Sequence, residues 1–210
     1  MEEEAARLMR FVLDLRQAGV RDAKILAAME RTPRAQFAPP HLASLALEDV
    51  ALPIACGQMM TKPSVIGQML AALEPRAGDN VLEVGAGSGW QGAVLASLAK
   101  KVTTLDRHRP LAADARVRFG ALRLMNIEAH GADGRLGWAE NAPYDRIIVN
   151  AAAPAAPLAL LEQLAEGGVL LIPIGEGQNA RLLRYRRGAA LPEELGAVAF
   201  TPLEEGPVQD

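Results

Sequence analysis

The sequence lacks several features that mark other classes of protein. Cys56 is the only cysteine, which excludes an intrachain disulfide and a cysteine-cluster metal site and fits a reducing compartment. No apolar run approaches the length of a membrane span. The formal net charge of -3 gives no general attraction to nucleic acid or to an anionic membrane, so binding to either would need a local basic patch.

The remaining composition is that of an ordinary soluble globular protein. Half of the chain is hydrophobic and about a fifth is charged. The length of 210 residues indicates one domain with room for a small appendage. The first residues, Met1-Glu2-Glu3-Glu4, are acidic where a signal peptide would be basic. We therefore expect a cytoplasmic protein.

The stretch that organises the chain is residues 81–91, which read Val-Leu-Glu-Val-Gly-Ala-Gly-Ser-Gly-Trp-Gln. A short apolar run ends in three alternating glycines, and an Ala- and Leu-rich segment then begins. This pattern predicts a strand, a tight turn and the start of a helix. Glycine at alternate positions lets the backbone turn sharply and lets a ligand approach it closely, because no Cβ intervenes. The start of the helix leaves N–H groups free to face that ligand.

Two classes of cofactor use such a turn. Residues 87–92 fit the dinucleotide pattern G-x-G-x-x-G, and residues 83–89 fit the E-x-G-x-G-x-G pattern of S-adenosylmethionine (SAM) methyltransferases. The carboxylate of Glu83 would repel a pyrophosphate but attract the sulfonium and ammonium groups of SAM. The dinucleotide match also begins two residues late, since the first glycine after the strand is Gly85. The turn therefore favours SAM, whereas a turn that only packs a helix on a strand would need fewer glycines.

The N-terminal part is predicted to be helical. Residues 5–18 carry apolar side chains at helical spacing before Gly19, and Asp22 can cap a second helix that ends at Thr32-Pro33. These helices are expected to form a cap or lid beside the main fold, although packing alone is the simpler interpretation.

Residues 49–63 are predicted to form a long connection, because they contain two prolines and show no helical or strand period. Long connections without secondary structure are often functional in compact domains. Thr61 stands near the end of this segment, before a helix whose apolar face begins at Val65. The sequence leaves open whether Thr61 caps that helix or takes part in catalysis.

From residue 79 onward, predicted strands and helices alternate. Strands are expected at 80–84, 102–105, 127–130, 146–151 and 169–174, helices at 90–99, after Pro110 and around 157–165, and an antiparallel pair of strands at 182–185 and 197–200. This order predicts an α/β protein with a Rossmann-like SAM-methyltransferase fold, a mostly parallel central sheet and helices on both faces. Residues 1–78 are expected to form an N-terminal helical cap and substrate loop, and residues 79–210 the SAM-binding core, together making one compact unit.

Three predicted features meet at one edge of this sheet. In open α/β sheets, ligands lie across the carboxyl ends of the strands, where residues 85–89, Asp106 and Asp133 all fall. Asp106 ends its strand about twenty residues after the turn, where an acid can accept hydrogen bonds from ribose hydroxyls. The sequence therefore places a cofactor site at this edge.

These residues carry a family resemblance. The chain resembles the protein-L-isoaspartate (D-aspartate) O-methyltransferase family of class I SAM-dependent methyltransferases from about Val20 to Leu203. The most specific parts of the match are Leu52-Pro53-Ile54 with Gly57-Gln58, and the run Ala-Pro-Tyr-Asp-Arg-Ile-Ile-Val at residues 142–149. Other parts are Thr32-Pro33-Arg34-Ala35-Gln36-Phe37, Glu48-Asp49, the turn at 85–91, Asp133-Gly134, Ala151-Ala152-Ala153-Pro154 and Gly167-Gly168.

The resemblance implies methyl transfer from SAM to the α-carboxylate of L-isoaspartyl residues in damaged proteins, a repair reaction. The expected partners are proteins or peptides that contain isoaspartyl residues, with no nucleic acid, no membrane and no metal, and the protein is expected to be a monomer. Carried over from the family, Glu83 and the glycines would hold the methionine end of SAM, Asp106 the ribose and Asp133 the adenine. The full set of cofactor-binding residues implied is Glu83, Gly85, Ala86, Gly87, Ser88, Gly89, Trp90, Asp106, Arg107, Asp133 and Gly134. The implied catalytic residue is Thr61, and the implied substrate-binding residues are Pro53, Ile54, Gln58, Met59, Met60 and Asn150.

Such a reaction needs little acid–base help. A carboxylate is ionised at neutral pH and can attack the methyl group in line, so the rate comes from alignment and exclusion of water. The three histidines, His41, His108 and His130, have no evident partners in the sequence and are expected to be surface or local structural residues.

The substrate loop departs from the family pattern Gly-Gln-Thr-Ile-Ser-x-Pro, whose serine is expected near the acceptor carboxylate. Residues 57–63 here read Gly-Gln-Met-Met-Thr-Lys-Pro. Thr61 keeps a hydroxyl, but Met59 replaces a polar residue by a flexible apolar one. Cys56 stands where the family has an aromatic residue or His, and Asn150 where it has Thr. We therefore predict a repair enzyme, with two alternatives: a paralogue that methylates another acceptor, and a SAM-binding module without transfer activity.

Overall fold

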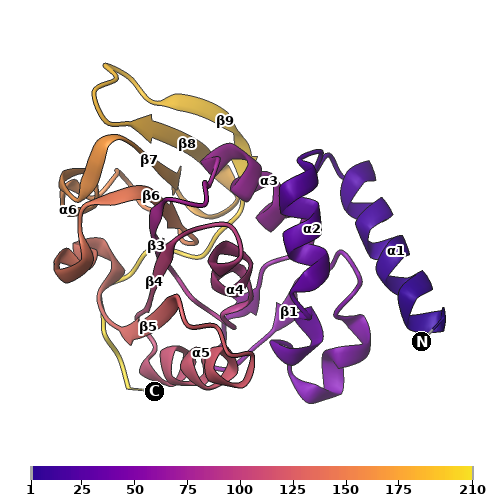
Figure 1. The fold of residues 1–210 in the computed structure, drawn as a ribbon. Helices are drawn as coiled ribbons and strands as arrows, with labels where there is room; N and C mark the ends of the chain where they lie inside the picture. Colours follow the sequence, from indigo (N-terminus) through magenta and orange to yellow (C-terminus); the bar gives the residue numbers. More distant parts are fainter. Residues whose placement is uncertain (1, 210) are drawn as a thin grey trace.

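The computed structural model describes residues 2–209 as a central sheet with helices on both faces and further helices beside it (Figure 1). The strands of the main sheet are β3 (Asn80–Val84), β4 (Lys101–Asp106), β5 (Ile127–Gly131), β6 (Tyr144–Val149), β7 (Leu164–Ile174), β8 (Ala180–Arg186) and β9 (Glu193–Val198). The helices are α1 (Glu2–Gln17), α2 (Ala23–Arg31), α3 (Pro63–Leu73), α4 (Trp90–Ala96), α5 (Arg109–Ala121) and α6 (Leu158–Glu162). A separate two-stranded ribbon consists of β1 (Leu52–Pro53) and β2 (Met59–Met60). Short 3-10 helices are η1 (Arg34–Gln36), η2 (Pro40–Leu45), η3 (Gly134–Leu136), η4 (Ala139–Asn141) and η5 (Gly177–Asn179).

The main sheet has the order β5-β4-β3-β6-β7-β8-β9. The first five strands in this order are parallel, and β8 and β9 run antiparallel to their neighbours. The predicted mostly parallel sheet with an antiparallel pair at one side is therefore confirmed. The strand order reverses between β3 and β6, and in open α/β sheets a crevice for ligands forms outside the carboxyl ends of the strands at such a point.

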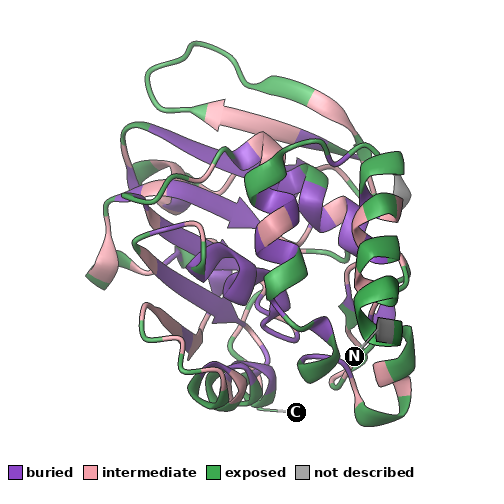
Figure 2. Cartoon of the chain, turned by 45° about the vertical axis from the view of Figure 1, so that its right-hand side comes forward, coloured by how far each residue is buried: buried purple, intermediate pink, exposed green. Residues whose placement is uncertain are grey.

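The two faces of the sheet belong to two hydrophobic clusters. One cluster packs the five helices from α1 through α5 against the sheet. The other contains α6 with inner residues of β6 and β7. Figure 2 shows the central strands and the inner helices as buried, while the outer side of α1 is exposed. A strand that is covered on both faces is mostly apolar, which explains the run Ile-Ile-Val at residues 147–149 of β6.

The N-terminal helices pack against α3 and α4. Asp22 caps α2 as predicted, because its Oδ1 accepts hydrogen bonds from the N–H groups of Lys24 (2.8 Å) and Ile25 (3.1 Å). Gly67 of α3 lies so close to the turn after α1 that an added Cβ would sit 2.7 Å from a methyl carbon of Val20. The cap is thus held by close helix contacts.

Of the two roles that the sequence leaves open for Thr61, the structure does not support the helix cap. The N-cap residue of α3 is Lys62, and no side chain of its own segment caps the helix. The carboxylate of Asp49, fifteen residues earlier, instead accepts the N–H of Ser64 at 2.7 Å. A distant acid therefore takes the capping contact that the sequence left open for Thr61.

Several element boundaries also differ from those predicted. The helix predicted at 90–99 ends at Ala96, and the last strand covers Glu193–Val198 and not 197–200. Strand β7 starts at Leu164, where the helix predicted around 157–165 was expected to continue, because Leu164 pairs with Tyr144 before the register shifts. The connection at 49–63, predicted to be irregular, contains the short β1–β2 ribbon.

Strand β9 forms one edge of the main sheet. Its pairing with β8 shifts register between Leu182 and Leu183, and Gly196 has a φ of +126°. Glu193 and Glu194 stand at its start and are exposed. Among the helices of residues 2–209, none is both long and apolar enough to cross a membrane.

Candidate active site

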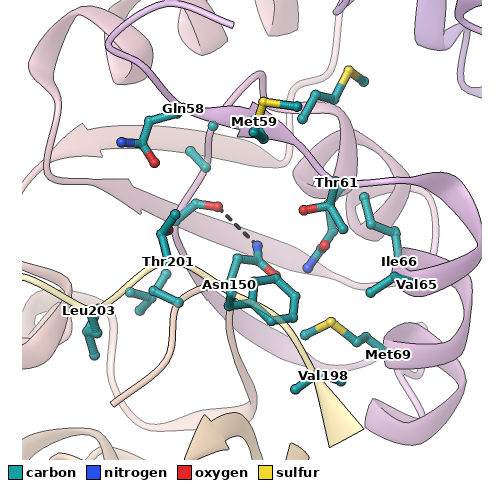
Figure 3. Close-up of a pocket in the computed structure, with 18 of the residues that line it drawn as sticks. Gln58, Met59, Thr61, Val65, Ile66, Met69, Asn150, Val198, Thr201 and Leu203 are labelled. Atoms are coloured by element: carbon teal, nitrogen blue, oxygen red, sulfur yellow. Dashed lines mark hydrogen bonds between the residues drawn. The ribbon is translucent and has the colours of Figure 1, made fainter. Parts of the chain in front are cut away.

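A cavity of about 980 Å³ opens at the carboxyl ends of β3, β4 and β6. Its walls come from the glycine turn, the end of β2 with the start of α3, and residues 197–204, which begin at the end of β9. Figure 3 shows Gln58, Thr61, Met69, Val198 and Thr201 arranged around Asn150. Segments more than 140 residues apart in sequence, such as Met59 and Phe200, thus share one cavity.

The glycine turn has the backbone that only glycine adopts readily. Gly85, Gly87 and Gly89 have φ values of +90°, +53° and +89°. A Cβ at Gly85 would meet that of Asn150 at 3.1 Å, and one at Gly89 would meet that of Ala115 at the same distance. A Cβ at Gly87 would meet no atom closer than 3.6 Å. Gly85 and Gly89 are therefore packed against protein, while Gly87 faces the cavity, where a ligand can approach its backbone.

Asp106 fixes the turn from the end of β4. One carboxylate oxygen accepts the N–H of Gly87 at 2.8 Å, and the other accepts the N–H of His108 at 2.9 Å. Burial raises the pKa of the Asp106 carboxyl, and these two hydrogen bonds oppose the rise. Asp106 lines the cavity, so its remaining lone pairs can accept hydrogen bonds from a ligand.

Glu83 lies below the cavity and does not line it. Its carboxylate accepts a hydrogen bond from the Thr104 hydroxyl at 2.6 Å and one from the Asn150 amide at 3.4 Å. Complete burial raises the pKa of this carboxyl to about 8. Gly92 of α4 packs directly over it, since an added Cβ would lie 2.7 Å from Glu83 Oε2.

Asn150 follows β6 and brings a side-chain amide into the cavity (Figure 3). Its Nδ2 donates to the Gly85 carbonyl at 3.0 Å, which sets the orientation of the amide. Its Oδ1 is buried and accepts no hydrogen bond from the residues that the structure describes. Because a buried acceptor without a donor is costly, this oxygen suits a ligand that carries an N–H or O–H group.

The β1–β2 ribbon carries the predicted substrate loop. The Ile54 N–H donates to the Gln58 carbonyl at 2.9 Å, and Cys56 between them has a φ of +58°. The Gln58 amide lies 3.4 Å from Nε2 of His108. This contact joins the loop to the residue that also donates to Asp106. His108, expected to be a surface or local structural residue, is buried and has a local structural role.

Arg34 holds the two ends of the segment that leads into the loop. Its guanidinium donates to the carbonyls of Ala46, Glu48 and Val50 and, at 3.4 Å, to that of Thr61. The same group lies 5.3 Å from the ring centre of Trp90, the first residue of α4. Only 1% of Arg34 is exposed, so this cation is an internal clamp between the substrate loop and the cofactor turn.

Asp133, predicted to contact the adenine, has its carboxylate bonded to other residues of the protein. Its carboxylate is engaged by Arg135, with Nη2 at 2.7 Å, and by the Gly206 N–H. Asp133 does not line the cavity, although its neighbour Gly134 does. Arg107 likewise forms an ion pair with Glu204 at the cavity wall. The segment after β9 therefore crosses the ends of β4 and β5 beside the predicted adenine position.

Most of the predicted site residues come together. Those that line the cavity are Gln58, Met59, Met60, Thr61, Gly85, Ala86, Gly87, Ser88, Trp90, Asp106, Arg107, Gly134 and Asn150. Those that do not are Pro53, Ile54, Glu83, Gly89 and Asp133. Within residues 2–209 no cluster of His, Cys, Asp and Glu is arranged to hold a metal ion.

Sequence reasoning missed two groups of cavity residues. The first is polar: Gln91 follows the turn directly, and His108 stands two residues after the acid that ends β4. Their closeness to the turn and to Asp106 was a usable signal. The second is apolar, from Val65, Ile66 and Met69 of α3 and from residues 197–203. Nothing in the local sequence could have shown that these distant segments meet.

Comparisons with known proteins agree with this geometry. The family model described as protein-L-isoaspartate (D-aspartate) O-methyltransferase matches residues 6–207. The protein-L-isoaspartate O-methyltransferase of Xanthobacter autotrophicus is 48% identical over 208 residues, covering 98% of this chain and 95% of the relative. The one from Paracoccus denitrificans is 48% identical over 207 residues, covering 97% of this chain and 96% of the relative.

Two solved structures share the fold. A protein-L-isoaspartate O-methyltransferase superposes with a TM-score of 0.84 at 22% identity, covering 96% of this chain and 67% of that one. A Plasmodium falciparum protein, described as a protein-L-isoaspartate O-methyltransferase in complex with S-adenosyl-L-homocysteine, gives 0.82 at 21% identity, covering 93% and 97%. The predicted Rossmann-like methyltransferase fold is therefore confirmed.

Proposed function

Because the chain belongs to the protein-L-isoaspartate (D-aspartate) O-methyltransferase family, we propose that its cavity is the place where SAM and an isoaspartyl carboxylate meet. The protein is a SAM-dependent O-methyltransferase of protein repair, which methylates L-isoaspartyl residues in damaged proteins or peptides. This conclusion rests on the sequence identity to the Xanthobacter autotrophicus and Paracoccus denitrificans enzymes, which covers nearly the whole length of this chain and of each relative. The two alternatives raised by the altered loop, another acceptor or a module without transfer, gain no support from the comparisons.

The cavity residues fit SAM, which supplies a methyl group on a positively charged sulfur. In the proposed arrangement, Gly87 lets the cofactor approach the turn, and Asp106 accepts hydrogen bonds from ribose hydroxyls with its free lone pairs. The unpartnered Oδ1 of Asn150 accepts one from the ammonium group of the methionine end. This assigns Asn150 to the cofactor, whereas the resemblance had implied contact with the substrate.

Two of the expected cofactor residues act indirectly in this proposal. Glu83 is completely buried, so it orients Asn150 and supports α4 without touching SAM. Asp133 holds Arg135 and the start of η3, and thereby positions the backbone of Gly134 at the cavity wall. Direct contact between the Asp133 carboxylate and the adenine would require release of Arg135.

The acceptor side uses the substrate loop. Thr61 lines the cavity without acting as a helix cap, so its hydroxyl is available to donate to the acceptor carboxylate. Met60 and the apolar residues of α3 form much of the wall nearby, which limits water around the attacking oxygen. Residues 1–78 thus supply the acceptor side and residues 79–210 the cofactor side of one compact unit. Met1 and Asp210, the outermost residues of these parts, lie outside the described residues.

The oligomeric state, the location and the partners of the enzyme can also be inferred. We propose that it acts as a monomer in the cytoplasm on isoaspartyl-containing proteins, without binding nucleic acid. The net charge of -3 and the single cysteine are consistent with this setting. Sedimentation at several concentrations would test the monomer, and a concentration-dependent increase in mass would exclude it.

The test of function uses SAM labelled in its methyl group, offered with paired isoaspartyl and aspartyl peptides of the same sequence. We expect base-labile label on the isoaspartyl peptide alone. Label on both peptides would mean that the Met59-Met60-Thr61 loop no longer distinguishes them. No label on either peptide, with SAM binding confirmed by calorimetry, would refute the repair activity.

A further inference from the structure

Gln91 has a buried side-chain amide in the cavity wall, and neither SAM nor the acceptor has yet been assigned to it. It is the second residue of α4, lines the cavity and is 5% exposed. Its Nε2 is buried and meets no hydrogen-bond acceptor among the residues that the structure describes. The amide nitrogens of the other cavity residues of this type are engaged: Asn150 with Gly85, Gln58 with Cys56, and Gln68 with Ala18.

A buried donor without an acceptor destabilises the free protein, because the N–H group has lost its hydrogen bond to water. Such groups are rare in native proteins, and a functional site is one of the accepted reasons for them. The complement of an N–H donor is an anionic or carbonyl oxygen. In this reaction, the groups that bring a carboxylate are the acceptor residue and the methionine end of SAM.

The contacts of α4 favour the acceptor. Trp90, the residue before Gln91, donates through Nε1 to the Thr32 carbonyl at 3.1 Å and lies beside the Arg34 guanidinium. Arg34 in turn donates to the Thr61 carbonyl. These contacts tie the start of α4 to the loop that carries Thr61, whereas the proposed contacts of the methionine end lie at Gly87 and Asn150.

We propose that Gln91 is a specificity-determining residue, whose amide donates to one oxygen of the isoaspartyl carboxylate. This role rests on the proposed function. The other carboxylate oxygen forms the new bond to the methyl carbon, and the carbon–sulfur bond breaks with its electron pair going to sulfur. The positive sulfur and the negative carboxylate are thereby both neutralised, and no proton moves. A neutral amide suits this step, because a cation in its place would bind the carboxylate more tightly and hold it back from attack.

The test compares two peptides in the presence of S-adenosylhomocysteine: an isoaspartyl peptide, and the same peptide with the acceptor carboxylate replaced by a primary amide. Calorimetry gives the ratio of the two affinities for the wild type, Gln91→Leu and Gln91→Glu. For Gln91→Leu we expect the preference for the acid to fall about tenfold, as expected for loss of a hydrogen bond to a charged group. For Gln91→Glu we expect the amide peptide to bind more tightly than the acid peptide, because the new carboxylate repels the acceptor carboxylate.

Gln68→Leu is the matched control, since Gln68 also lines the cavity but is exposed and bonded to Ala18. It should leave the ratio unchanged. A merely structural role of Gln91 would change stability but not the acid-to-amide ratio, and the near-isosteric Glu variant remains informative if the Leu variant unfolds. An unchanged ratio in both Gln91 variants would overturn the proposal. A loss of SAM affinity with an unchanged ratio would overturn it too, and would assign the amide to the methionine carboxylate. Methylation of the isoaspartyl peptide by the wild type in the same series keeps a failure of this role distinct from a failure of the proposed function.

Discussion

At the scale of single residues, the Thr61 hydroxyl is the most direct point of test. Thr61→Val keeps the shape and removes the hydroxyl, and because Thr61 is not the cap of α3, stability should change little. We expect methyl transfer to isoaspartyl peptide to fall at least tenfold, the effect of losing one hydrogen bond to a charged group. Steady-state rates measure it, and Thr61→Ser should restore activity. Full activity of the Val variant would remove Thr61 from the acceptor site.

Asp106 is the residue on which the proposed ribose contact depends. Asp106→Ala removes both the acceptor for ribose and the anchor of the Gly87 and His108 N–H groups. SAM affinity should fall about tenfold or more, because a charged hydrogen bond is lost and the turn loosens. Calorimetry with SAM is the measurement. Thr103→Val, which removes a buried hydroxyl on the same strand whose partners are Glu128 and Asn141, serves as the control for general loss of stability. Unchanged SAM affinity would exclude the ribose role.

The buried carboxyl of Glu83 makes stability depend on pH. Burial raises its pKa in the folded protein to about 8, against 4.5 for an exposed group. The folded state therefore holds the proton more tightly, and this contribution to stability is complete below pH 4.5 and is lost as pH rises to about 8. Glu83→Gln, which is neutral throughout, should gain stability over the wild type across that window. Urea midpoints at a series of pH values test this, and a difference that does not vary with pH would contradict it.

Residue identities predict much of the cavity lining, and the exceptions have physical causes. The turn, Asp106 and Asn150 were predictable because they occupy fixed places at strand ends. Glu83 and Asp133 were predicted as cofactor contacts, but neither lines the cavity. Thr104 and Asn150 donate hydrogen bonds to Glu83, and Arg135 donates to Asp133. A carboxylate's partner can lie anywhere in the fold, so sequence position alone cannot show whether a ligand or a neighbouring side chain meets it.

At the scale of elements, the clamp on the substrate loop gives a prediction for Arg34. Arg34→Met keeps the length of the side chain but leaves the carbonyls of Ala46, Glu48, Val50 and Thr61 without their donor. We expect a loss of about 3 kcal/mol in unfolding free energy, because several buried acceptors lose their hydrogen bonds. Chemical denaturation measures the loss, and limited proteolysis should cut within residues 46–62. Arg31→Met, a change at the exposed last residue of α2, is the matched control.

Elements with a clear period were predictable, and those shaped by distant contacts were not. Strand β3 was predicted at its observed bounds, because an apolar run between a polar turn and the glycines leaves little choice. The acid that bonds the first turn of α3 was not predictable, because Asp49 comes from a segment with no regular pattern. The early start of β7 depends on a single pairing between Leu164 and Tyr144, which no local signal encodes.

At the scale of the whole molecule, the cavity should make ligand binding stabilise distant parts together. Its lining runs from Ala51 to Glu204, so a ligand there contacts both the cap and the core. S-adenosylhomocysteine at about 100 times its Kd should add about 2.7 kcal/mol to the unfolding free energy. Hydrogen exchange should slow in residues 49–62 and 197–204 at once. Slowing in the second segment alone would mean that the substrate loop is not coupled to the cofactor.

The sheet edge at β9 affects how this enzyme can interact with its protein substrates. An open sheet edge would invite extended segments of protein substrates to add as further strands and aggregate. The outer edge here begins with Glu193 and Glu194 and is interrupted by the register shift near Gly196. Charged side chains and a break in the ladder both discourage strand addition. The enzyme can therefore bind extended segments of its substrates without those segments adding to its sheet edge.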